Sequence, residues 1–364
     1  MDALNLYDFH QKLGARFMDL NGKQAVSEYE DDAGEQRSLT ESAGIIDLSF
    51  RSRVSLTGAD RVRFLHGQVT NDIKSLRPGT GCYAALVTAK GRMQSDLNVY
   101  ALANELLLDF EPGLTNAVCE RLEKYIVADD VELVDVATQY SLLSIQGPQS
   151  AAVASGLKLV PELPSAPFHF CTVMDSPLGE LYLVNQPRLG TAGFDLYLPI
   201  SAMATVAEQA LTLTKAIGGG ACGWQALEAA RIEAGIPRFG SDMDETNLPQ
   251  ECGIESSAIS YNKGCYIGQE VLNRIHTMGH VNRHLSGFKL AENLENLPQR
   301  GDKLFFEGRE IGFITSALLS RRLRRPIALG YVRRERDQVG GELTLRTAGQ
   351  ESTARVAELP FRPD

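Results

Sequence analysis

The order of expected helices and strands repeats along the first two thirds of the sequence, and this repeat restricts the possible folds more than any other feature. Periodicity and turn signals predict a first copy with strands at 53–57, 82–88, 94–101, 105–110 and 131–136 and helices at 58–67 and 112–126. A second copy has strands at 140–146, 168–174, 179–186 and 193–199 and helices that begin at Pro148 and Ser201. Helices mixed with antiparallel strands favour α+β over a doubly wound parallel sheet. We therefore expect two similar α+β lobes of ferredoxin-like type, about 90 residues each, although the residue identities are not repeated.

The last ninety or so residues contain short strand patterns and no convincing helix. The expected strands are 283–291, 303–307, 310–317, 327–333, 342–348 and 353–359. Turn signals such as Glu307-Gly308 and Gly340-Gly341 separate them. This pattern predicts a small closed β-barrel of six strands. We expect two regions, with the lobes in residues 1–270 and the barrel in residues 271–364.

The segments outside the two copies are less regular. Apolar residues between Leu4 and Phe17 are spaced as on one face of a helix, with Asp2 as a candidate cap. Residues 21–40 are polar, which indicates loops. A helix is expected from Trp224 to Ala234, ending at Gly235.

Composition excludes several classes of protein. No apolar run approaches the roughly 18 residues of a membrane span, and the first residues lack the layout of a signal peptide, so we expect a cytoplasmic protein. The six cysteines include no pair two residues apart, which argues against a metal cluster or zinc site built from this chain alone. Net charge is −10, which argues against general nucleic-acid affinity. The basic run 321–325 fits a solvated turn, or a contact with phosphate or an acidic protein.

The densest chemistry lies in one octet, Lys263-Gly264-Cys265-Tyr266-Ile267-Gly268-Gln269-Glu270. Gly264 and Gly268 allow the backbone to turn sharply around Cys265. A helix is expected to start after Gly268, and its N–H groups together with Lys263 would favour a thiolate. The alternative is a small buried hydrophobic cysteine, but the polar and glycine-rich neighbours favour a reactive thiol.

This octet resembles the signature of the YgfZ family, folate-binding proteins of iron–sulfur cluster maintenance that are relatives of the glycine-cleavage T-protein (aminomethyltransferase). Seven positions match the signature Lys-Gly-Cys-aromatic-any-Gly-Gln-Glu, namely Lys263, Gly264, Cys265, Tyr266, Gly268, Gln269 and Glu270. The wider T-protein resemblance covers nearly the whole chain, and it is carried by Leu6–His10, Val54–Gly58, Thr70–Asp72, Gly91–Tyr100, Leu227–Gly235, Gly240–Asp242, Gly312–Ser316 and Ala328–Val332. It implies three domains around a central opening where folate binds.

The resemblance also implies roles for single residues. Asp96 interrupts an apolar strand, which by itself indicates an exposed strand residue; T-proteins have an aspartate at the matching position next to the folate, where it assists proton transfer. Arg231 would otherwise be a helix-surface residue, but it matches the arginine that binds folate, whose acceptors suit a guanidinium fork.

One family feature is missing. T-proteins carry a glutamate in a Gly-Tyr-Thr-Gly-Glu-Asp-Gly run after an arginine, whereas the corresponding segment here, 188–195, is shorter and lacks it. Asp195 is a weak substitute candidate for binding the folate.

Three histidines, His276, His280 and His284, are spaced like metal ligands on a helix. Gly279 interrupts helix, and the segment from Arg274 to Arg283 resembles the family's extended link into the barrel, so we expect no metal there.

These features give three hypotheses. The first is a tetrahydrofolate-binding protein that supports assembly or repair of iron–sulfur enzymes, including those that modify tRNA, with Cys265 and Asp96 at the site and iron–sulfur proteins or their assembly factors as partners. The second is an aminomethyltransferase that moves a one-carbon unit from an aminomethyl-lipoyl carrier protein to tetrahydrofolate, which Asp96 supports and Cys265 and the missing glutamate oppose. The third is a scaffold whose folate site has decayed.

Overall fold

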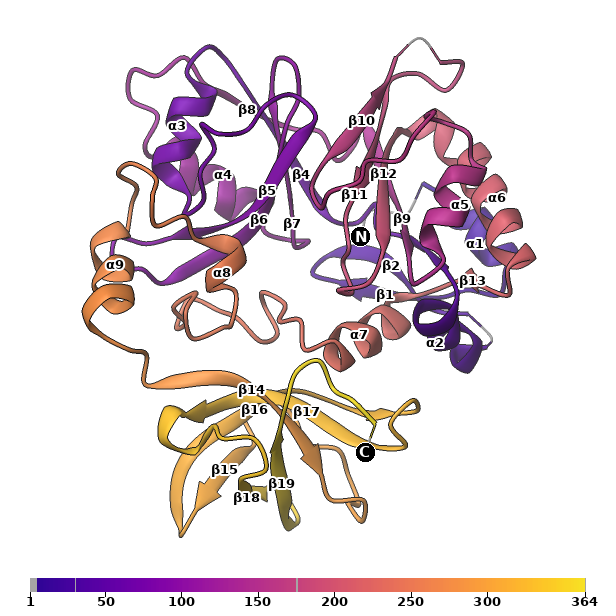
Figure 1. Cartoon of the computed structure of the whole chain (residues 1–364). Helices are drawn as coiled ribbons and strands as arrows, with labels where there is room; N and C mark the ends of the chain where they lie inside the picture. Colours follow the sequence, from indigo (N-terminus) through magenta and orange to yellow (C-terminus); the bar gives the residue numbers. More distant parts are fainter. Residues whose placement is uncertain (1–4, 30, 175, 364) are drawn as a thin grey trace. The chain divides into compact units, whose positions relative to one another are not determined.

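A computed structural model describes residues 5–29, 31–174 and 176–363. The chain forms two compact units (Figure 1). The first contains the residues up to Leu86 and Ser95–Ala230, and the second contains Val87–Gln94 and the residues from Arg231 onward. The division of the chain at residue 270 into a folate-binding region and a barrel domain stays a prediction.

The first unit holds a five-stranded sheet in the order β5-β6-β7-β4-β8. Its elements are β4 (Ser52–Thr57), α3 (Arg61–Gln68), β5 (Thr80–Val87), β6 (Met93–Ala101), β7 (Leu106–Phe110), α4 (Thr115–Glu123) and β8 (Glu132–Asp135). One face of this sheet is apolar and packs with both helices in a single buried cluster that includes Leu56, Leu65, Val99, Leu108 and Leu122. Alternation along each strand sends the remaining side chains to the opposite face.

A second sheet of the same unit has the order β10-β11-β12-β9-β3-β13. Its strands are β3 (Gly44–Asp47), β9 (Tyr140–Gln146), β10 (Phe170–Val173), β11 (Leu181–Asn185), β12 (Gly193–Pro199) and β13 (Gly220–Ala221), and its helices are α5 (Ser150–Gly156) and α6 (Ile200–Ala216). The two helices pack on its apolar face with residues such as Leu143, Leu196 and Val206. The first five positions repeat the order of the first sheet, with β3 in the place of β8.

The remaining faces of the two sheets share one buried cluster. It joins Tyr100 and Leu107 of the first sheet to Tyr182 and Tyr197 of the second, and the rings of Tyr100 and Tyr197 meet edge to face with centroids 5.8 Å apart. The two sheets therefore pack face to face, and polar side chains on these faces lie between them.

The second unit contains a closed six-stranded barrel in the order β14-β17-β16-β15-β18-β19 (Figure 1). Its strands are β14 (Arg283–Leu290), β15 (Lys303–Phe306), β16 (Arg309–Ser320), β17 (Arg325–Arg333), β18 (Glu342–Arg346) and β19 (Glu351–Ala357), with the short 3-10 helix η1 (Arg334–Arg336) after β17. Phe288, Leu304, Ile314, Leu345 and Val356 belong to its buried cluster. The predicted fold class, mixed α+β with a C-terminal six-stranded barrel, is confirmed.

The N-terminal expectations are partly wrong. Helix α1 covers only Tyr7–Lys12, because Gly14 adopts a left-handed φ of 78° and the chain continues as β1 (Arg16–Leu20). The expected loops at 21–40 are β2 (Lys23–Glu28), which pairs with β1, and α2 (Asp32–Glu41), which is capped by Asp31. The candidate cap Asp2 lies outside the described residues.

Three further helices lie in the described part of the chain: α7 (Trp224–Glu233), α8 (Glu255–Ala258) and α9 (Gln269–Met278). The expected helix at 224–234 is therefore present as α7. Among the helices of the described residues, none has the length and apolar character to cross a membrane.

Candidate functional site

Polar side chains of the first sheet gather on the face that packs against the second sheet. On β6, Leu97 and Val99 point into the apolar core, so Asp96 and Asn98 point to the other side. The same alternation on β7 and β5 places Asp109 and Tyr83 on this face. A strand that alternates apolar and polar residues thus presents ionisable groups at a fixed spacing along a rigid sheet.

Asp96 is half-buried, and its two carboxylate oxygens differ. Oδ2 accepts a 2.8 Å hydrogen bond from the Tyr83 hydroxyl, whereas Oδ1 is sealed from solvent and has no hydrogen-bond partner among the described residues. Burial, together with the negative charge of Glu111, raises the pKa of Asp96 to about 6, although Tyr83 and Arg51 act in the opposite direction. A carboxylate that titrates near neutral pH and keeps an unused acceptor is suited to hold or move a proton.

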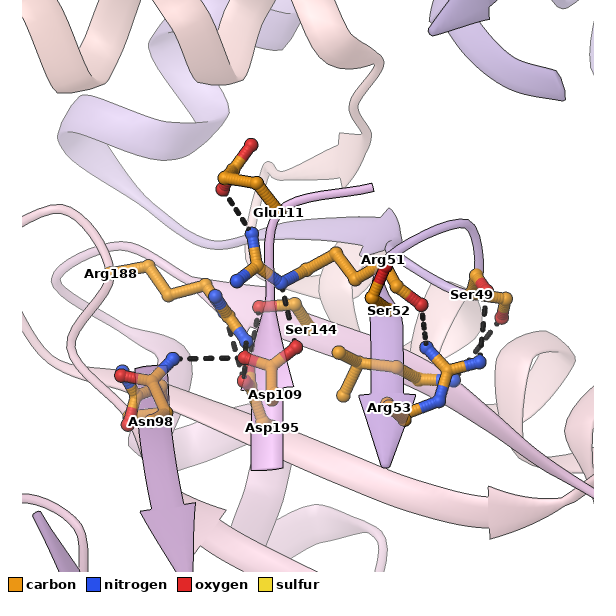
Figure 2. Close-up of polar contacts among 12 residues, drawn as sticks. Ser49, Arg51, Ser52, Arg53, Asn98, Asp109, Glu111, Ser144, Arg188 and Asp195 are labelled. Atoms are coloured by element: carbon orange, nitrogen blue, oxygen red, sulfur yellow. Dashed lines mark hydrogen bonds and ion pairs between the residues drawn. The ribbon is translucent and has the colours of Figure 1, made fainter. Parts of the chain in front are cut away.

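A network of buried charges lies on this face of the sheet (Figure 2), and two of its members, Glu111 and Arg51, act on the charge of Asp96. Asp109 is fully buried and accepts hydrogen bonds from Arg51 Nε at 2.7 Å, Asn98 Nδ2 at 2.9 Å and Arg188 at 2.9 Å. Arg51 also binds Glu111. Arg188 comes from the loop between β11 and β12, so the network links the two sheets.

The positive and negative charges of this network compensate one another. Burial opposes ionisation of Asp109, but the guanidinium groups of Arg51 and Arg188 outweigh it and hold the pKa of Asp109 well below its usual value. Arg53 is fully buried and donates to the carbonyl oxygens of Arg51, Ser49, Ala137 and Tyr140. Burial lowers the pKa of the Arg53 guanidinium. Arg51, Asp109 and Arg188 therefore form a structural clamp. Asp96 lies on the same face of the sheet but keeps one oxygen without a partner.

Asp195, the expected substitute for the missing glutamate, lies on β12 in the first unit. Its side chain is fully buried, and it accepts hydrogen bonds from Ser144 Oγ at 2.7 Å and Arg188 Nε at 2.9 Å. Asp195 and Asp109 share Arg188 (Figure 2). The structure therefore joins Asp195 to the clamp, and its carboxylate already has partners of its own.

Arg231 lies near the end of α7, in the second unit. It is buried, its guanidinium contacts the Asp242 carboxylate, and it donates to Ser316 Oγ at 3.0 Å and to the Ile236 carbonyl oxygen at 3.3 Å. Asp242 also accepts hydrogen bonds from Thr315 and Ser316 of β16. These contacts fix the end of α7 to the barrel.

The octet forms a loop that leads into α9, also in the second unit. Lys263 and Tyr266 are buried, with the Lys263 amine 4.8 Å from the centroid of the Tyr266 ring. Gly264 and Cys265 are exposed. The expected helix begins at Gln269, and Glu270 in its first turn suits the helix dipole. The thiol is therefore accessible, and the buried-hydrophobe alternative for Cys265 does not hold.

Gly268 is required by the backbone. Its φ is 86°, and an added Cβ would lie 2.6 Å from the carbonyl oxygen of Thr88, a distance that forces neighbouring atoms to move.

The histidine segment departs from the expected extended link. Helix α9 continues to Met278 and ends at Gly279. His276 binds Glu255 at 3.0 Å and stacks on Tyr261, whereas His284 lies on β14 and binds Asp337. His276 and His284 thus belong to different elements, and each has a carboxylate partner.

Comparisons with known proteins place this architecture in a defined class. A solved structure, the glycine cleavage system aminomethyltransferase T from Bartonella henselae, superposes with a TM-score of 0.88 at 24% identity, and the match covers 99% of this chain and 98% of that one. The two proteins share the fold.

The sequence comparisons are more specific. A family model described as the GCVT N-terminal domain matches residues 6–263, and one described as the glycine cleavage T-protein C-terminal barrel domain matches residues 283–362. The chain therefore belongs to the glycine cleavage T-protein family. Relatives named aminomethyltransferase include one from Desulforamulus reducens, 29% identical over 98% of this chain and 96% of the relative, and one from Halothermothrix orenii, 27% identical over 99% and 100%.

These findings correct the first hypothesis. The expected role in iron–sulfur cluster assembly or tRNA modification is contradicted, because the chain matches the glycine cleavage T-protein family models and its relatives are named aminomethyltransferase. The resemblance to the T-protein superfamily is confirmed, but these comparisons do not support the assignment to the YgfZ branch through the octet. The second hypothesis is the one they favour.

Proposed function

We propose that this protein is an aminomethyltransferase that transfers a one-carbon unit from an aminomethyl-lipoyl carrier protein to tetrahydrofolate. The observation that carries the proposal is Asp96, a half-buried carboxylate with one sealed, unpaired oxygen on the polar face of a T-protein fold. We place this activity in the cytoplasm, as the sequence led us to expect.

The residues present fit a reduced folate. Its pterin ring carries N–H donors, and the unpaired Oδ1 of Asp96 offers an acceptor for one of them once the atoms that cover this oxygen move aside. When bound, tetrahydrofolate supplies the amine nitrogens that take up the one-carbon unit. We propose residues 1–270 as the region that binds it.

Asp96 performs the proton chemistry in this proposal. With a pKa of about 6 it is mainly ionised at neutral pH and still exchanges protons readily. The Tyr83 hydroxyl fixes the direction of the carboxylate through its bond to Oδ2, and the clamp of Arg51, Asp109 and Arg188 keeps the sheet face rigid.

The other expected site residues differ in whether their side chains are free to reach a ligand. Arg231 and Asp195 already bind protein groups, so a direct contact with folate requires each to share or exchange a partner. Cys265 needs no such change because its sulfur is accessible. We propose that its thiol contacts the one-carbon unit.

The test is release of ammonia and formation of methylenetetrahydrofolate from an aminomethyl-lipoyl donor protein. Asp96→Asn keeps the shape of the side chain and removes the base, so turnover should fall by about 100-fold or more. Glu132→Gln is the matched control, because Glu132 is exposed on β8 of the same sheet, and it should retain normal turnover. Absence of turnover in the natural protein would reject the proposal.

The role of Cys265 is tested in the same assay. Cys265→Ala should melt at the temperature of the natural protein, since the side chain is exposed, but should lose turnover by about tenfold or more if the thiol acts in the reaction. Unchanged turnover removes Cys265 from the site and leaves Asp96 as the proposed catalytic group.

A further inference from the structure

We propose that a small cavity between the two sheets of the first unit binds ordered water, which joins the sheets through hydrogen bonds. The cavity has a volume of about 30 Å³, and its wall includes Arg53 of β4, Leu107 of β7, Tyr182 of β11 and Tyr197 of β12. The last three side chains belong to the buried cluster that both sheets share. The cavity is therefore an internal part of the contact between the sheets.

The size of the cavity fits water. A cavity can hold a water molecule once its volume reaches about 10–15 Å³, so a volume of about 30 Å³ leaves room for about two. Sites for organic ligands usually have volumes of about 300–1,000 Å³, so a molecule of that kind does not fit. Glu105 and Tyr140, two further residues of the wall, are only half-buried, and the cavity therefore lies close to solvent on their side.

Arg53 supplies the first polar partner for the water. Its side chain is fully buried, and its two terminal nitrogens donate to the carbonyl oxygens of Arg51, Ser49, Ala137 and Tyr140. Its Nε, by contrast, has no hydrogen-bond partner among the described residues. A buried N–H group without a partner carries the full cost of its desolvation, and most buried polar groups are paired with protein or with ordered water. We therefore expect Arg53 Nε to donate to a water molecule.

Tyr197 supplies a second polar partner, from the opposite sheet. Its hydroxyl is sealed from solvent and has no hydrogen-bond partner among the described residues, although buried tyrosine hydroxyls usually find one. Burial lowers the pKa of the Arg53 guanidinium, whereas Asp109 and Tyr197 raise it, so the Tyr197 hydroxyl lies near Arg53. Because Arg53 belongs to the first sheet and Tyr197 to the second, water that binds both groups bridges the two sheets.

The rest of the wall selects water over a small anion. Glu105 and Ser55 both line the cavity, and the Glu105 carboxylate accepts a hydrogen bond from the Ser55 hydroxyl. An anion held by Arg53 would share the cavity with this carboxylate, and the two negative charges would repel each other. A water molecule accepts a hydrogen bond from Arg53 Nε and donates its own protons to the oxygens of Tyr197 or Glu105. Water therefore matches both the donors and the acceptors of the wall.

A high-resolution crystal structure of the whole chain tests the proposal directly. It should show water within about 2.7–3.2 Å of both Arg53 Nε and the Tyr197 hydroxyl. A second crystal, soaked in sodium bromide, should give no anomalous signal in the cavity, because bromide marks sites for small anions. Absence of electron density for water at these two groups, or a bromide peak beside Arg53, would overturn the proposal.

The variant Tyr197→Phe tests the same site in solution through the sign of its effect. If the hydroxyl binds water, the substitution removes a hydrogen bond, and the melting temperature should fall by about 2 °C or more. If the hydroxyl is buried without any partner, it costs stability, and its removal should leave the melting temperature unchanged or raise it. Either of these last two results would contradict the proposal.

The matched control is Tyr125→Phe. Tyr125 follows α4 in the same unit, is 38% exposed and lies outside the cavity. Loss of its hydroxyl should change the melting temperature by less than about 1 °C, because an exposed hydroxyl binds solvent in the folded and unfolded chain alike. An equal fall in both variants would mean that the effect of Tyr197→Phe does not come from the cavity, and would overturn the proposal. The transferase assay is independent of this outcome.

Discussion

At the scale of single residues, the most important feature is that the carboxylates on one sheet face differ in their partners and in their pKa. Asp109 has two guanidinium partners, and its pKa is held low. Asp96 has one hydroxyl partner and an unpaired oxygen, and its pKa is raised to about 6. Neighbouring acids thus have different tasks because their partners differ, one structural and one available for proton transfer.

The raised pKa of Asp96 predicts a pH-dependent stability. An acid whose folded pKa exceeds its unfolded value stabilises the fold below the unfolded pKa, and this contribution is lost as pH rises through about 6. Asp96→Asn should therefore gain stability relative to the natural protein between about pH 4 and pH 7, by up to about 3 kcal/mol. Urea unfolding across this range measures it, and parallel profiles for the two proteins would contradict the environment described for Asp96.

At the scale of elements, the start of α9 depends on one glycine. Gly268→Ala should destabilise the protein through its left-handed φ and through the clash with the Thr88 carbonyl. Gly308 in the β15–β16 turn also has a positive φ, of 76°, but open space around it.

Comparing the two substitutions separates the two causes. Gly308→Ala should cost about 1 kcal/mol from backbone strain alone, whereas Gly268→Ala should cost about 2 kcal/mol more from the clash. Urea denaturation gives both values. Equal costs would mean that the turn before α9 relaxes without resistance.

The contact between the two sheets depends on Arg188. Arg188→Met leaves Asp109 and Asp195 buried without their shared cation, and loss of one partner of a buried ion pair costs about 3–5 kcal/mol. Arg300→Met is the control, since the Arg300–Asp244 pair is 47% and 40% exposed and should cost under about 1 kcal/mol. Thermal unfolding distinguishes them, and a small loss in the Arg188 variant would show that water enters between the sheets.

At the scale of the whole molecule, the net charge of −10 determines which partners approach. We predict no binding to a labelled 20-base-pair DNA duplex at about 150 mM salt, because an acidic protein gains little from counterion release. Fluorescence anisotropy measures this directly. Saturable binding under these conditions would contradict this prediction.

Much of the architecture could be predicted from the sequence because the strands are short, alternating and separated by turn residues. The barrel strands and the repeated order of the lobes followed from this pattern. The prediction for the N-terminal segment was wrong for two reasons. Gly14 ends a helix that apolar spacing alone would extend to Phe17. Strand β2 gains its stability from pairing with β1, which its own sequence does not indicate.

The site could be predicted only in part. Asp96 was found because a charged residue interrupts an apolar strand. Tyr83, Arg51 and the shared role of Arg188 were missed, since their partners lie on other strands and sequence spacing carries no information about which strands face each other. The octet identified an exposed thiol but led to the wrong branch of function, because a local motif outweighed the family pattern along the rest of the chain.

The position of β3 has a practical consequence for anyone cutting this protein into fragments. Residues 44–47 precede the first lobe in the chain, yet they form the strand between β9 and β13 in the second sheet. A truncation that starts at residue 48 would therefore leave the first sheet complete and remove a strand next to the middle of the second. Expression boundaries for the first unit should keep the N-terminal segment attached, because halves taken in chain order are not halves of the fold.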